Sequence, residues 1–421
     1  MREMIRIIMP LIFILIDLYF FTGVQTVIKD FSPQRKSTIQ IAYWVVSALT
    51  IILLSVTFSV SDNKLPVIFR SVVVSVLFVL FISKFLGCII LLIDDIARLF
   101  RWGAQLATTI NHPEKREGIS RLKFLTYTAT GLFSVSFLSL FYGVVRGRKN
   151  LKTHTVKLSF KNLPKSFDGL KMVQISDIHT GSFPDTSLLE EAFDQILALK
   201  PDVIFFTGDL VNDKATETDG FLPVYQKLKA PMGVFSILGN HDYGDYAEWE
   251  SGQAKRDNLN ALKKIHAEAG WRLLINEHVA LEKNGEQIAL LGIENWGGNL
   301  HFPKYGRMDL AYKGTEKYPF KLLLSHDPSH WDVQVKKEYT DIDLTLSGHT
   351  HGAQFGIEIP GLVKWSPSKY FYKQWAGLYK NNNQHLYVNR GLGCVGREHT
   401  PAYNGRLGIW PEITLIELHS A

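Results

Sequence analysis

The sequence predicts an all-α region of four transmembrane spans followed by an α/β domain in which two packed sheets are flanked by helices. Long apolar runs dominate the first 145 residues, whereas the rest of the 421-residue chain has the composition of a water-soluble domain. In that remainder, short apolar strands alternate with helical patterns, which is typical of sheets buried on both faces. Several of these strands end in clusters of acidic, amide and imidazole side chains, and such strand ends indicate a functional site.

Four apolar segments are each long enough to cross a bilayer, which requires about 20 residues. Helices that are apolar on all sides at this length seldom occur in water, so buried core helices are the weaker alternative. The first segment also resembles a signal peptide, but the three that follow it favour a membrane domain. The four segments are residues 5–28, 39–60, 67–93 and 124–145.

These patterns divide the chain into a transmembrane domain over residues 1–145, a linker over 146–156 and a water-soluble domain over 157–421. The linker is predicted from the basic and polar stretch RGRKNLKTH that follows the last span. Asp17 falls inside the first span, where we expect it to face the interior of the helical bundle or to lie near an interface. A packing role and a functional role are both open for this carboxylate.

The orientation of the protein in the membrane rests on one local motif. Lysine and arginine residues are almost equally frequent on the two sides of the four spans, so the positive-inside rule does not decide the orientation. The segment SRLKFL, residues 120–125, resembles a twin-arginine export signal in which Leu122 replaces one arginine. Because such a signal stays cytoplasmic while the following chain is exported, the resemblance favours an outward-facing soluble domain in a multi-pass protein of the bacterial cell membrane.

Charge and cysteine content argue against two classes of protein. The net charge is only +6, and no dense block of lysine and arginine is present, so a nucleic-acid partner is not expected. Cys88 and Cys394 are the two cysteines, they are far apart in the chain, and Cys88 lies in an apolar run. A disulfide framework is therefore not expected either.

The soluble domain begins at Lys157 as an alternation of strands and helices. Helices are predicted over DTSLLEEAFDQILALK, capped by Asp185 or Thr186, and over GFLPVYQKLKA. The pair Asn284-Gly285 between two apolar runs predicts a hairpin turn. The predicted strands are KMVQISD, PDVIFFTGD, GVFSILGNHD, WRLLIN, the two halves of HVALEKNGEQIALLGIE, FKLLLSHD, IDLTLSGH, QHLYVNRG and RLGIWPEITLIEL.

Five of these strands end in polar clusters, which we expect to meet at one edge of the sheets. Carboxylate, imidazole and amide oxygen ligands suit Zn, Mn, Fe or similar ions, and the clusters contain no thiolate of the kind that structural zinc sites use. Each cluster alone is more typical of a cap, a turn or a buried histidine, but all five together indicate a metal site. The clusters are Asp177-Ile-His179, Gly208-Asp209, Gly239-Asn240-His241-Asp242, Ser325-His326 and Gly348-His349-Thr-His351.

With these motifs the chain resembles the calcineurin-like metallophosphoesterases over about residues 155–420. The family pattern D-x-H, G-D-x-x-D/N, G-N-H-D/E, H and G-H-x-H is unbroken, with Asn212 at the variable position of the second motif. The stretches GLKMVQISDIHTG and SGHTHGAQ look most like the membrane-associated bacterial branch, which includes phosphodiesterases and UDP-diacylglucosamine pyrophosphatases. The resemblance implies an α-β-β-α metallophosphoesterase sandwich for the soluble domain, which would then be catalytic.

The resemblance also implies a role for each motif residue around two divalent metal ions, which would be Mn, Zn or Fe. His241 is expected to face the substrate phosphate and the leaving group, and Asp242 is expected to orient His241. Asp209 is expected to bridge the two ions. One ion would take Asp177, His179, Asp209 and His351, and the other would take Asp209, Asn240, His326 and His349.

The implied chemistry is metal-dependent hydrolysis of a phosphoric ester. Two ions held about 3.5–4 Å apart lower the pKa of a bridging water and clamp the phosphoryl oxygens. Attack by a metal-bound hydroxide would then cleave the ester, and no covalent enzyme intermediate is needed. His241, as imidazolium, would stabilise the phosphoryl oxygen or protonate the leaving oxygen.

The membrane anchor is the best guide to the substrate. It favours a phosphodiester or pyrophosphate bond in a lipid-linked substrate, such as a glycolipid of the UDP-diacylglucosamine type. A nuclease, a general phosphomonoesterase and a non-catalytic membrane scaffold or sensor are the alternatives. The aromatic loop KWSPSKYFYKQWAGLY, residues 364–379, is expected to cover the substrate or touch the membrane interface, or else to pack as a cap on the sheet. Arg390 and Arg397 are expected either to bind phosphate or to serve surface solubility.

Overall fold

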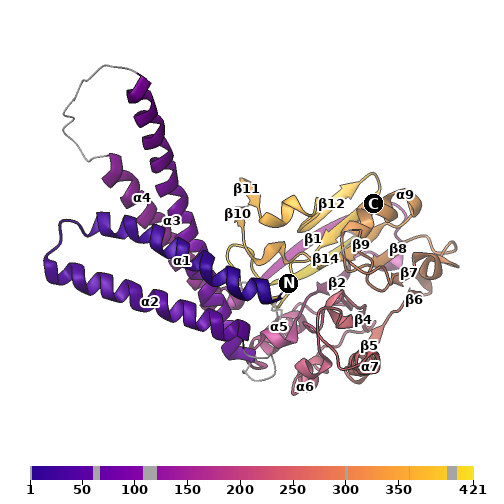
Figure 1. The fold of residues 1–421 in the computed structure, drawn as a ribbon. Helices are drawn as coiled ribbons and strands as arrows, with labels where there is room; N and C mark the ends of the chain where they lie inside the picture. Colours follow the sequence, from indigo (N-terminus) through magenta and orange to yellow (C-terminus); the bar gives the residue numbers. More distant parts are fainter. Residues whose placement is uncertain (1, 60–66, 108–120, 299–301, 360, 396–404) are drawn as a thin grey trace. The chain divides into compact units, whose positions relative to one another are not determined.

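A computed structural model describes residues 2–59, 67–107, 121–298, 302–359, 361–395 and 405–421 (Figure 1). Its internal contacts divide the chain into two compact units, a helical unit that ends at Tyr142 and a second unit that begins at Gly143. Arg397 and Ser120 lie outside the described residues.

The helical unit consists of long apolar helices, as the sequence predicts. Among the described residues, four stretches are long and apolar enough to span a membrane, namely Ile8–Val27, Pro33–Thr57, Val73–Phe100 and Lys123–Val145. At 41 residues, α3 is about 60 Å long, twice the thickness of a bilayer core. The helices are α1 (Arg2–Val27), α2 (Pro33–Ser59), α3 (Val67–Ala107) and α4 (Arg121–Val145).

Asp17 faces the interior of the helical unit, which confirms the first of the two expected placements. Its side chain is almost completely buried and pairs with Lys84 of α3 at 2.5 Å. Ser47 of α2 donates a hydrogen bond to the same carboxylate, and the Tyr43 hydroxyl donates to the Asp17 backbone carbonyl at 2.8 Å. A buried intramembrane carboxylate is costly unless it is paired, so this ion pair and its hydrogen bonds join α1, α2 and α3.

The second unit contains two six-stranded sheets, which confirms the predicted two-sheet architecture. In spatial order they are β1-β14-β2-β3-β4-β5 and β12-β13-β9-β8-β7-β6 (Figure 1). The strands are β1 (Lys152–Phe160), β2 (Leu170–Ile175), β3 (Val203–Phe206), β4 (Val234–Ser236), β5 (Trp271–Leu273), β6 (Glu277–Lys283), β7 (Glu286–Gly292), β8 (Lys321–Leu324), β9 (Leu344–Ser347), β12 (Gly377–Asn381), β13 (Gln384–Val388) and β14 (Glu412–Ser420).

The sheets pack face to face, and helices cover the outer face of each. In β3 every residue is buried because Val203 and Phe205 enter the core between the sheets, whereas Ile204 and Phe206 pack under the helices. The helices over the first sheet are α5 (Ser187–Ala198), α6 (Leu222–Tyr225) and α7 (Gly252–Glu268), and α8 (Met308–Tyr312) packs on the outer face of the second. This α-β-β-α order is the predicted sandwich.

Within each sheet, the strands that carry the polar clusters run parallel to one another. β2, β3 and β4 are parallel in the first sheet, and β8 and β9 are parallel in the second. The carboxyl ends of parallel strands lie on the same edge of a sheet, so the loops that follow these strands converge. The predicted hairpin is also confirmed, since Asn284 and Gly285 join β6 to β7 with positive φ angles of 50° and 82°.

The structure corrects the predicted linker over residues 146–156. β1 begins inside it, at Lys152, and pairs in parallel with β14 from Lys152 opposite Glu412 to Phe160 opposite Ser420. β1 is an edge strand whose first residues are largely exposed, which explains the polar composition that suggested a linker. The first strand therefore starts before Lys157, only a few residues after the end of α4 at Val145.

The predicted helices also differ in extent from those in the structure. The predicted helix α5 is confirmed. Of the two predicted caps, Asp185 accepts the Ser187 N–H at 2.9 Å, whereas the Thr186 side chain makes no capping hydrogen bond. The predicted helix GFLPVYQKLKA is reduced to the four residues of α6. α7 was not predicted; the Ser251 hydroxyl caps it by accepting the Ala254 N–H.

Candidate metal centre

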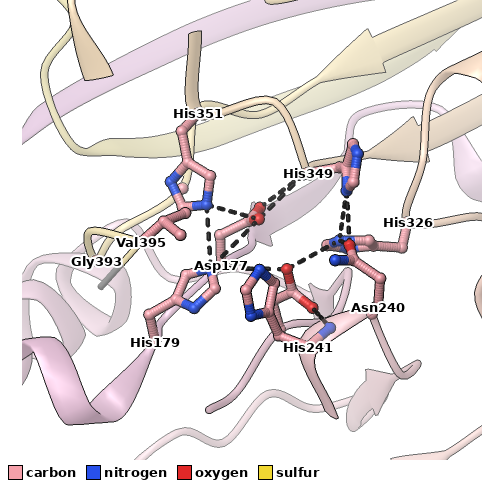
Figure 2. Close-up of polar contacts among 12 residues, drawn as sticks. Asp177, His179, Asn240, His241, His326, His349, His351, Gly393 and Val395 are labelled. Atoms are coloured by element: carbon pink, nitrogen blue, oxygen red, sulfur yellow. Dashed lines mark hydrogen bonds and ion pairs between the residues drawn. The ribbon is translucent and has the colours of Figure 1, made fainter. Parts of the chain in front are cut away.

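The loops after five strands bring the predicted ligands together at one edge of the two sheets. The loops that follow β2, β3 and β4 contribute from the first sheet, and those after β8 and β9 contribute from the second. Figure 2 shows the side chains from both sheets pointing toward one another. The predicted ligands gathered there are Asp177, His179, Asp209, Asn240, His326, His349 and His351, all buried except the half-buried His349.

Asp177, His179 and His351 form the first cluster. The Nε2 atoms of His179 and His351 are 3.0 Å apart, and the His351 Nε2 lies 3.1 Å from Asp177 Oδ1. Two buried imidazole nitrogens at this distance repel each other if both are unprotonated, because their lone pairs face one another. A proton or a cation between the two nitrogens removes this repulsion. The donor set and its close spacing therefore fit a divalent ion.

Asp209, His326 and His349 form the second cluster, and the amide oxygen of Asn240 joins it. Asn240 Oδ1 lies 2.7 Å from His349 Nδ1 and 3.1 Å from His326 Nε2, and these two nitrogens are themselves 3.3 Å apart. The same crowding of nitrogen and oxygen donors thus occurs a second time. Among the described residues, the carboxylate and imidazole groups close enough to share an ion fall into these two clusters.

Asp209 lies between the two clusters. Its Oδ2 atom is 3.6 Å from His179 Nε2 in the first cluster and 3.1 Å from His326 Nε2 in the second. Its other oxygen accepts the backbone N–H of His241 at 2.8 Å, which fixes the carboxylate. This placement fits the predicted bridging role.

The backbone at the ligands is held in the left-handed region that side chains other than glycine rarely adopt. Such conformations cost about 1–3 kcal/mol each and persist where the surrounding structure imposes them, typically at functional sites. The strained backbone is therefore a second indication of a functional site at this edge of the two sheets, independent of the kinds of side chain found there. The φ angles are 51° at Asp177, 45° at His179, 60° at Asp209, 74° at His349 and 49° at His351.

The glycines of the motifs let neighbouring loops approach the ligands. Gly208 has a φ of 95°, and a Cβ there would lie 2.5 Å from the Gly239 backbone nitrogen and 2.9 Å from His326 Nδ1. At Gly348 a Cβ would overlap the side chains of Ser176 and Asp177. These two positions require glycine because a ligand occupies the space of the missing side chain.

Burial and charge act against each other at the ligands. Burial opposes ionisation of the Asp177 and Asp209 carboxyls, but neighbouring imidazoles, chiefly His351 and His326, hold the pKa of both carboxyls well below the usual range. Burial lowers the pKa of His179, so this imidazole is neutral at pH 7. Burial also opposes protonation of His326, but Asp209 raises its pKa to about 10. A cation that binds the His326 nitrogen must therefore displace a proton.

Three groups that hold the ligands in place were not predicted from the sequence. The Asn240 amide nitrogen donates to the Tyr246 hydroxyl at 2.9 Å, which turns the amide oxygen toward the second cluster. The Thr207 backbone carbonyl lies 2.7 Å from His326 Nδ1 and directs the Nε2 atom inward. Tyr372 places its hydroxyl 2.7 Å from His349 Nε2, which leaves Nδ1 facing the cluster.

We expect Tyr372→Phe to weaken metal binding and turnover by about 10- to 100-fold, the usual effect of losing a group that orients a ligand. The Tyr372 hydroxyl fixes the His349 ring and its tautomer, so its removal frees the ring to rotate. Metal titration and initial rates on the purified chain would measure both effects. Tyr370→Phe is the matched control, because Tyr370 is 70% exposed and only two residues away. Equal effects of the two substitutions would contradict the orienting role.

His241 and Asp242 follow Asn240 but have separate structural roles. The His241 Nδ1 atom lies 2.7 Å from the Asn212 backbone carbonyl, which therefore orients the imidazole. The Asp242 carboxylate instead accepts the backbone N–H groups of Gly239, Asp209, Leu210 and Val211, at 2.8 to 3.3 Å. The prediction that Asp242 orients His241 is therefore wrong. Asp242 is a positioning residue that fixes the loop carrying Asp209, a role that depends on backbone groups of another loop.

We expect Asp242→Asn to lower the stability of the second unit by about 1–3 kcal/mol, the cost of a buried donor left unpaired. The carboxylate uses each oxygen to accept two N–H groups, so an amide nitrogen in its place would face two donors. A lower melting temperature by tryptophan fluorescence would show this. Asp194→Asn, at an exposed position on α5, is the control. An unchanged melting temperature for Asp242→Asn would contradict the assignment.

Arg390 serves neither of the roles expected for it. Its guanidinium is buried and donates to Glu412, and it also forms a 2.7 Å ion pair with Glu358. Glu412 accepts from Tyr387 as well, so the arginine belongs to a buried polar network between β13 and β14. Its charge is neutralised within the fold, so it neither adds to surface solubility nor is available to bind phosphate.

Comparison with known proteins agrees with this geometry. The family model described as calcineurin-like phosphoesterase matches residues 170–353, and the model described as the probable transmembrane domain of a calcineurin-like phosphoesterase matches residues 1–148. The metallophosphoesterase YkuE of Bacillus subtilis is 32% identical over 274 residues, which cover 63% of this chain and 84% of YkuE.

Two further relatives carry more specific names. Phosphodiesterase YaeI of Escherichia coli is 27% identical over 304 residues, covering 71% of this chain and 99% of YaeI. UDP-2,3-diacylglucosamine pyrophosphatase LpxG of Chlamydia trachomatis is 29% identical over 278 residues, covering 55% of this chain and 81% of LpxG. Proteins of this family use two divalent ions, and this chain has two clusters suited to them. The chain therefore belongs to the calcineurin-like metallophosphoesterases and is a multi-pass membrane member of that family with a metal-dependent phosphoesterase domain.

Proposed function

We propose that this protein hydrolyses a phosphodiester or pyrophosphate bond of a lipid-linked substrate at the membrane surface. The observation that carries the proposal is the pair of buried carboxylate and imidazole clusters that share Asp209. A dinuclear centre of this kind stabilises in-line displacement at phosphorus, and it serves esters and pyrophosphates alike. The choice of a lipid-linked substrate rests on the four candidate membrane spans in the same chain.

In this proposal each cluster holds one divalent ion. Two groups of residues would hold the ions: Asp177, His179 and His351 the first, and Asn240, His326 and His349 the second, with Asp209 contributing to both. When bound, the two ions lower the pKa of a coordinated water and offset the negative charge of the phosphoryl group. The buried protein groups around them exclude other water and keep the ligands in fixed positions.

His241 is the proposed proton donor of the reaction. Because its Nδ1 atom faces the Asn212 carbonyl, Nδ1 carries a proton, and Nε2 is the nitrogen whose protonation changes. The His241 ring lies 4.9 Å from the His179 ring, which places it beside the first cluster. An imidazolium there stabilises a phosphoryl oxygen and protonates the leaving oxygen.

Two relatives support the bond type and the substrate class without establishing either for this chain. YaeI is named a phosphodiesterase, and LpxG is named a pyrophosphatase of UDP-2,3-diacylglucosamine, a nucleotide-linked lipid. A substrate with acyl chains is concentrated in the bilayer that the four spans cross, so an enzyme tethered there meets it at high local concentration.

We further propose that the phosphoesterase unit faces the outer side of a bacterial cell membrane. The twin-arginine-like segment at the start of α4 supports this orientation. A bulky maleimide added to intact cells would test it with Lys264→Cys, an exposed position on α7. Labelling of intact cells supports the outer face, and labelling only after the membrane is permeabilised contradicts it.

The full-length chain, purified in detergent, should hydrolyse bis-p-nitrophenyl phosphate with Mn²⁺ and lose this activity with EDTA. Reconstituted into vesicles, it should cleave a UDP-diacylglucosamine type glycolipid faster than a water-soluble nucleotide sugar pyrophosphate. Turnover of the soluble diester alone would reject the lipid-linked substrate and favour a general phosphodiesterase or nuclease. The absence of turnover with either substrate, despite two bound metals per chain, would favour the non-catalytic scaffold.

A further inference from the structure

A small two-stranded ribbon beyond the main sheets has one polar and one apolar face. β10 (Ile357–Ile359) and β11 (Val363–Trp365) pair antiparallel, with Ile357 opposite Trp365, Glu358 opposite Lys364 and Ile359 opposite Val363. Residues directly opposite each other in an antiparallel pair project to the same face of the ribbon. One face therefore carries four apolar side chains, and the other carries the Glu358 and Lys364 pair.

The polar face attaches the ribbon to the rest of the unit. Glu358 accepts from the buried guanidinium of Arg390 at 2.7 and 2.9 Å, and the Lys364 ammonium donates to the Ala376 carbonyl. The ribbon is thus held from its polar side, and its apolar side is turned away from these contacts. The backbone bond from Gly356 N–H to the Leu407 carbonyl fixes the start of the ribbon.

The apolar side is exposed to an extent that is unusual for side chains of this kind. Ile357, Ile359 and Val363 are 51%, 48% and 40% exposed, and Leu362 at the tip is 76% exposed. The turn after β11 adds Tyr370 and Phe371, which are 70% and 78% exposed. The Trp365 ring nitrogen lies 3.5 Å from the Tyr370 hydroxyl, so the turn and the ribbon form one surface. We call these seven residues the apolar ribbon surface.

This surface is connected directly to the metal centre. Tyr372 follows Phe371, and its hydroxyl lies 2.7 Å from His349 Nε2. The aromatic loop over 364–379 therefore has one part at the metal centre and another part on the surface. Tyr372 and Trp375 pack against the site, whereas Tyr370 and Phe371 project outward.

We propose that the apolar ribbon surface inserts into the interfacial region of the lipid bilayer and so fixes the metal centre at the membrane surface. Exposed apolar patches on soluble units mark binding surfaces. The composition identifies the partner, because tryptophan, tyrosine and phenylalanine beside the exposed lysines Lys369 and Lys373 are typical of segments that lie in a lipid headgroup layer. The bilayer is also always nearby, since the same chain carries four candidate spans. The benefit for a lipid-linked substrate rests on the proposed function, but the insertion itself does not.

The test measures insertion without using activity. Both native cysteines are buried, and C88A and C394A together give a background for single labelling. Leu362→Cys in the full-length chain, labelled with an environment-sensitive nitrobenzoxadiazole dye, is placed in phosphatidylcholine and phosphatidylglycerol vesicles containing spin-labelled lipid. Leu310→Cys is the matched control, since Leu310 is an exposed leucine on α8 in the same unit.

Insertion predicts a blue-shifted emission at position 362 that spin-labelled lipid quenches, and little quenching at position 310. Equal quenching at the two positions would overturn the proposal. A blue shift at position 362 that lipid does not quench would also overturn it, because a second protein copy would then cover the surface.

A kinetic measurement separates this inference from the proposed function. Leu362→Asp should slow hydrolysis of a p-nitrophenyl phosphodiester carried on a diacylglycerol in vesicles, yet leave hydrolysis of soluble bis-p-nitrophenyl phosphate unchanged. An equal loss on both substrates would argue against a membrane role. If neither substrate is hydrolysed by the unaltered chain, the proposed function fails, but the quenching result still decides whether the surface inserts.

Discussion

Replacing Asp209 by asparagine is expected to cause the largest loss of activity of any single conservative change in this protein. Its carboxylate is the group nearest to both clusters, at 3.6 Å from His179 Nε2 and 3.1 Å from His326 Nε2. An amide cannot supply the negative charge that offsets two divalent ions in a buried site. Loss of a group that only orients a ligand costs about 10- to 100-fold, so loss of a shared ligand should exceed roughly 100-fold in kcat.

Metal analysis distinguishes this explanation from a general folding defect. Asp209→Asn should carry fewer than the wild-type number of ions per chain, and its melting temperature with EDTA should stay close to that of the wild type with EDTA. Asp219→Asn is the matched control, because Asp219 is an exposed aspartate in the same connecting segment. Asp209→Asn with both ions and full turnover would exclude the bridging role.

The proposed ligands were predictable because each lies in the loop just after a strand, and the buried strands can be recognised from their sequence. The run Val203–Phe206 is apolar at every position because both of its faces are covered, so its end and the following Asp209 are unambiguous. β9, which the two histidines follow, is likewise buried at every position, although leucine alternates there with threonine and serine. Parallel pairing then brings these ends to one edge, and this rule needs no knowledge of the tertiary contacts.

The groups that hold the ligands were not predictable because they depend on contacts between distant loops. Tyr372 reaches His349 from 23 residues further along the chain, and nothing in its local sequence distinguishes it from Tyr370, which is exposed. The adjacency of Asp242 and His241 in the sequence suggests that Asp242 orients the imidazole. Its carboxylate instead binds backbone groups near Asp209, 33 residues earlier.

The same limit explains the errors in the fold. β1 is polar along much of its length, and its strand conformation depends on pairing with β14, more than 250 residues away. Local composition cannot reveal such a partner, so the sequence predicts a linker where the first part of the strand lies. The polar and apolar faces of the ribbon formed by β10 and β11 follow only from the pairing register of the two strands. A strand of three residues is too short to show an alternation of polar and apolar residues in the sequence.

The His241 imidazole is expected to affect the chemical step and not metal binding. The His241 backbone N–H donates to Asp209 Oδ1 at 2.8 Å, and the ring is oriented by the Asn212 carbonyl, which lies 2.7 Å from Nδ1. Its ring also lies 4.8 Å from the Tyr246 ring, in a tilted contact. These contacts fix the ring beside the first cluster, and His241 is not among the proposed metal ligands.

His241→Ala should therefore lower kcat by about 10²- to 10⁴-fold, the range for loss of a positioned acid or base, with metal content unchanged. The loss should be smaller for a p-nitrophenyl diester than for an alkyl diester, because p-nitrophenolate leaves without being protonated. His419→Ala, at a half-buried histidine on β14, is the control and should match the wild type on both substrates. A loss of the same size for both leaving groups would assign His241 to stabilisation of the phosphoryl oxygen. A loss of bound metal would instead show that His241 acts on metal binding, and neither as proton donor nor in stabilising the phosphoryl oxygen.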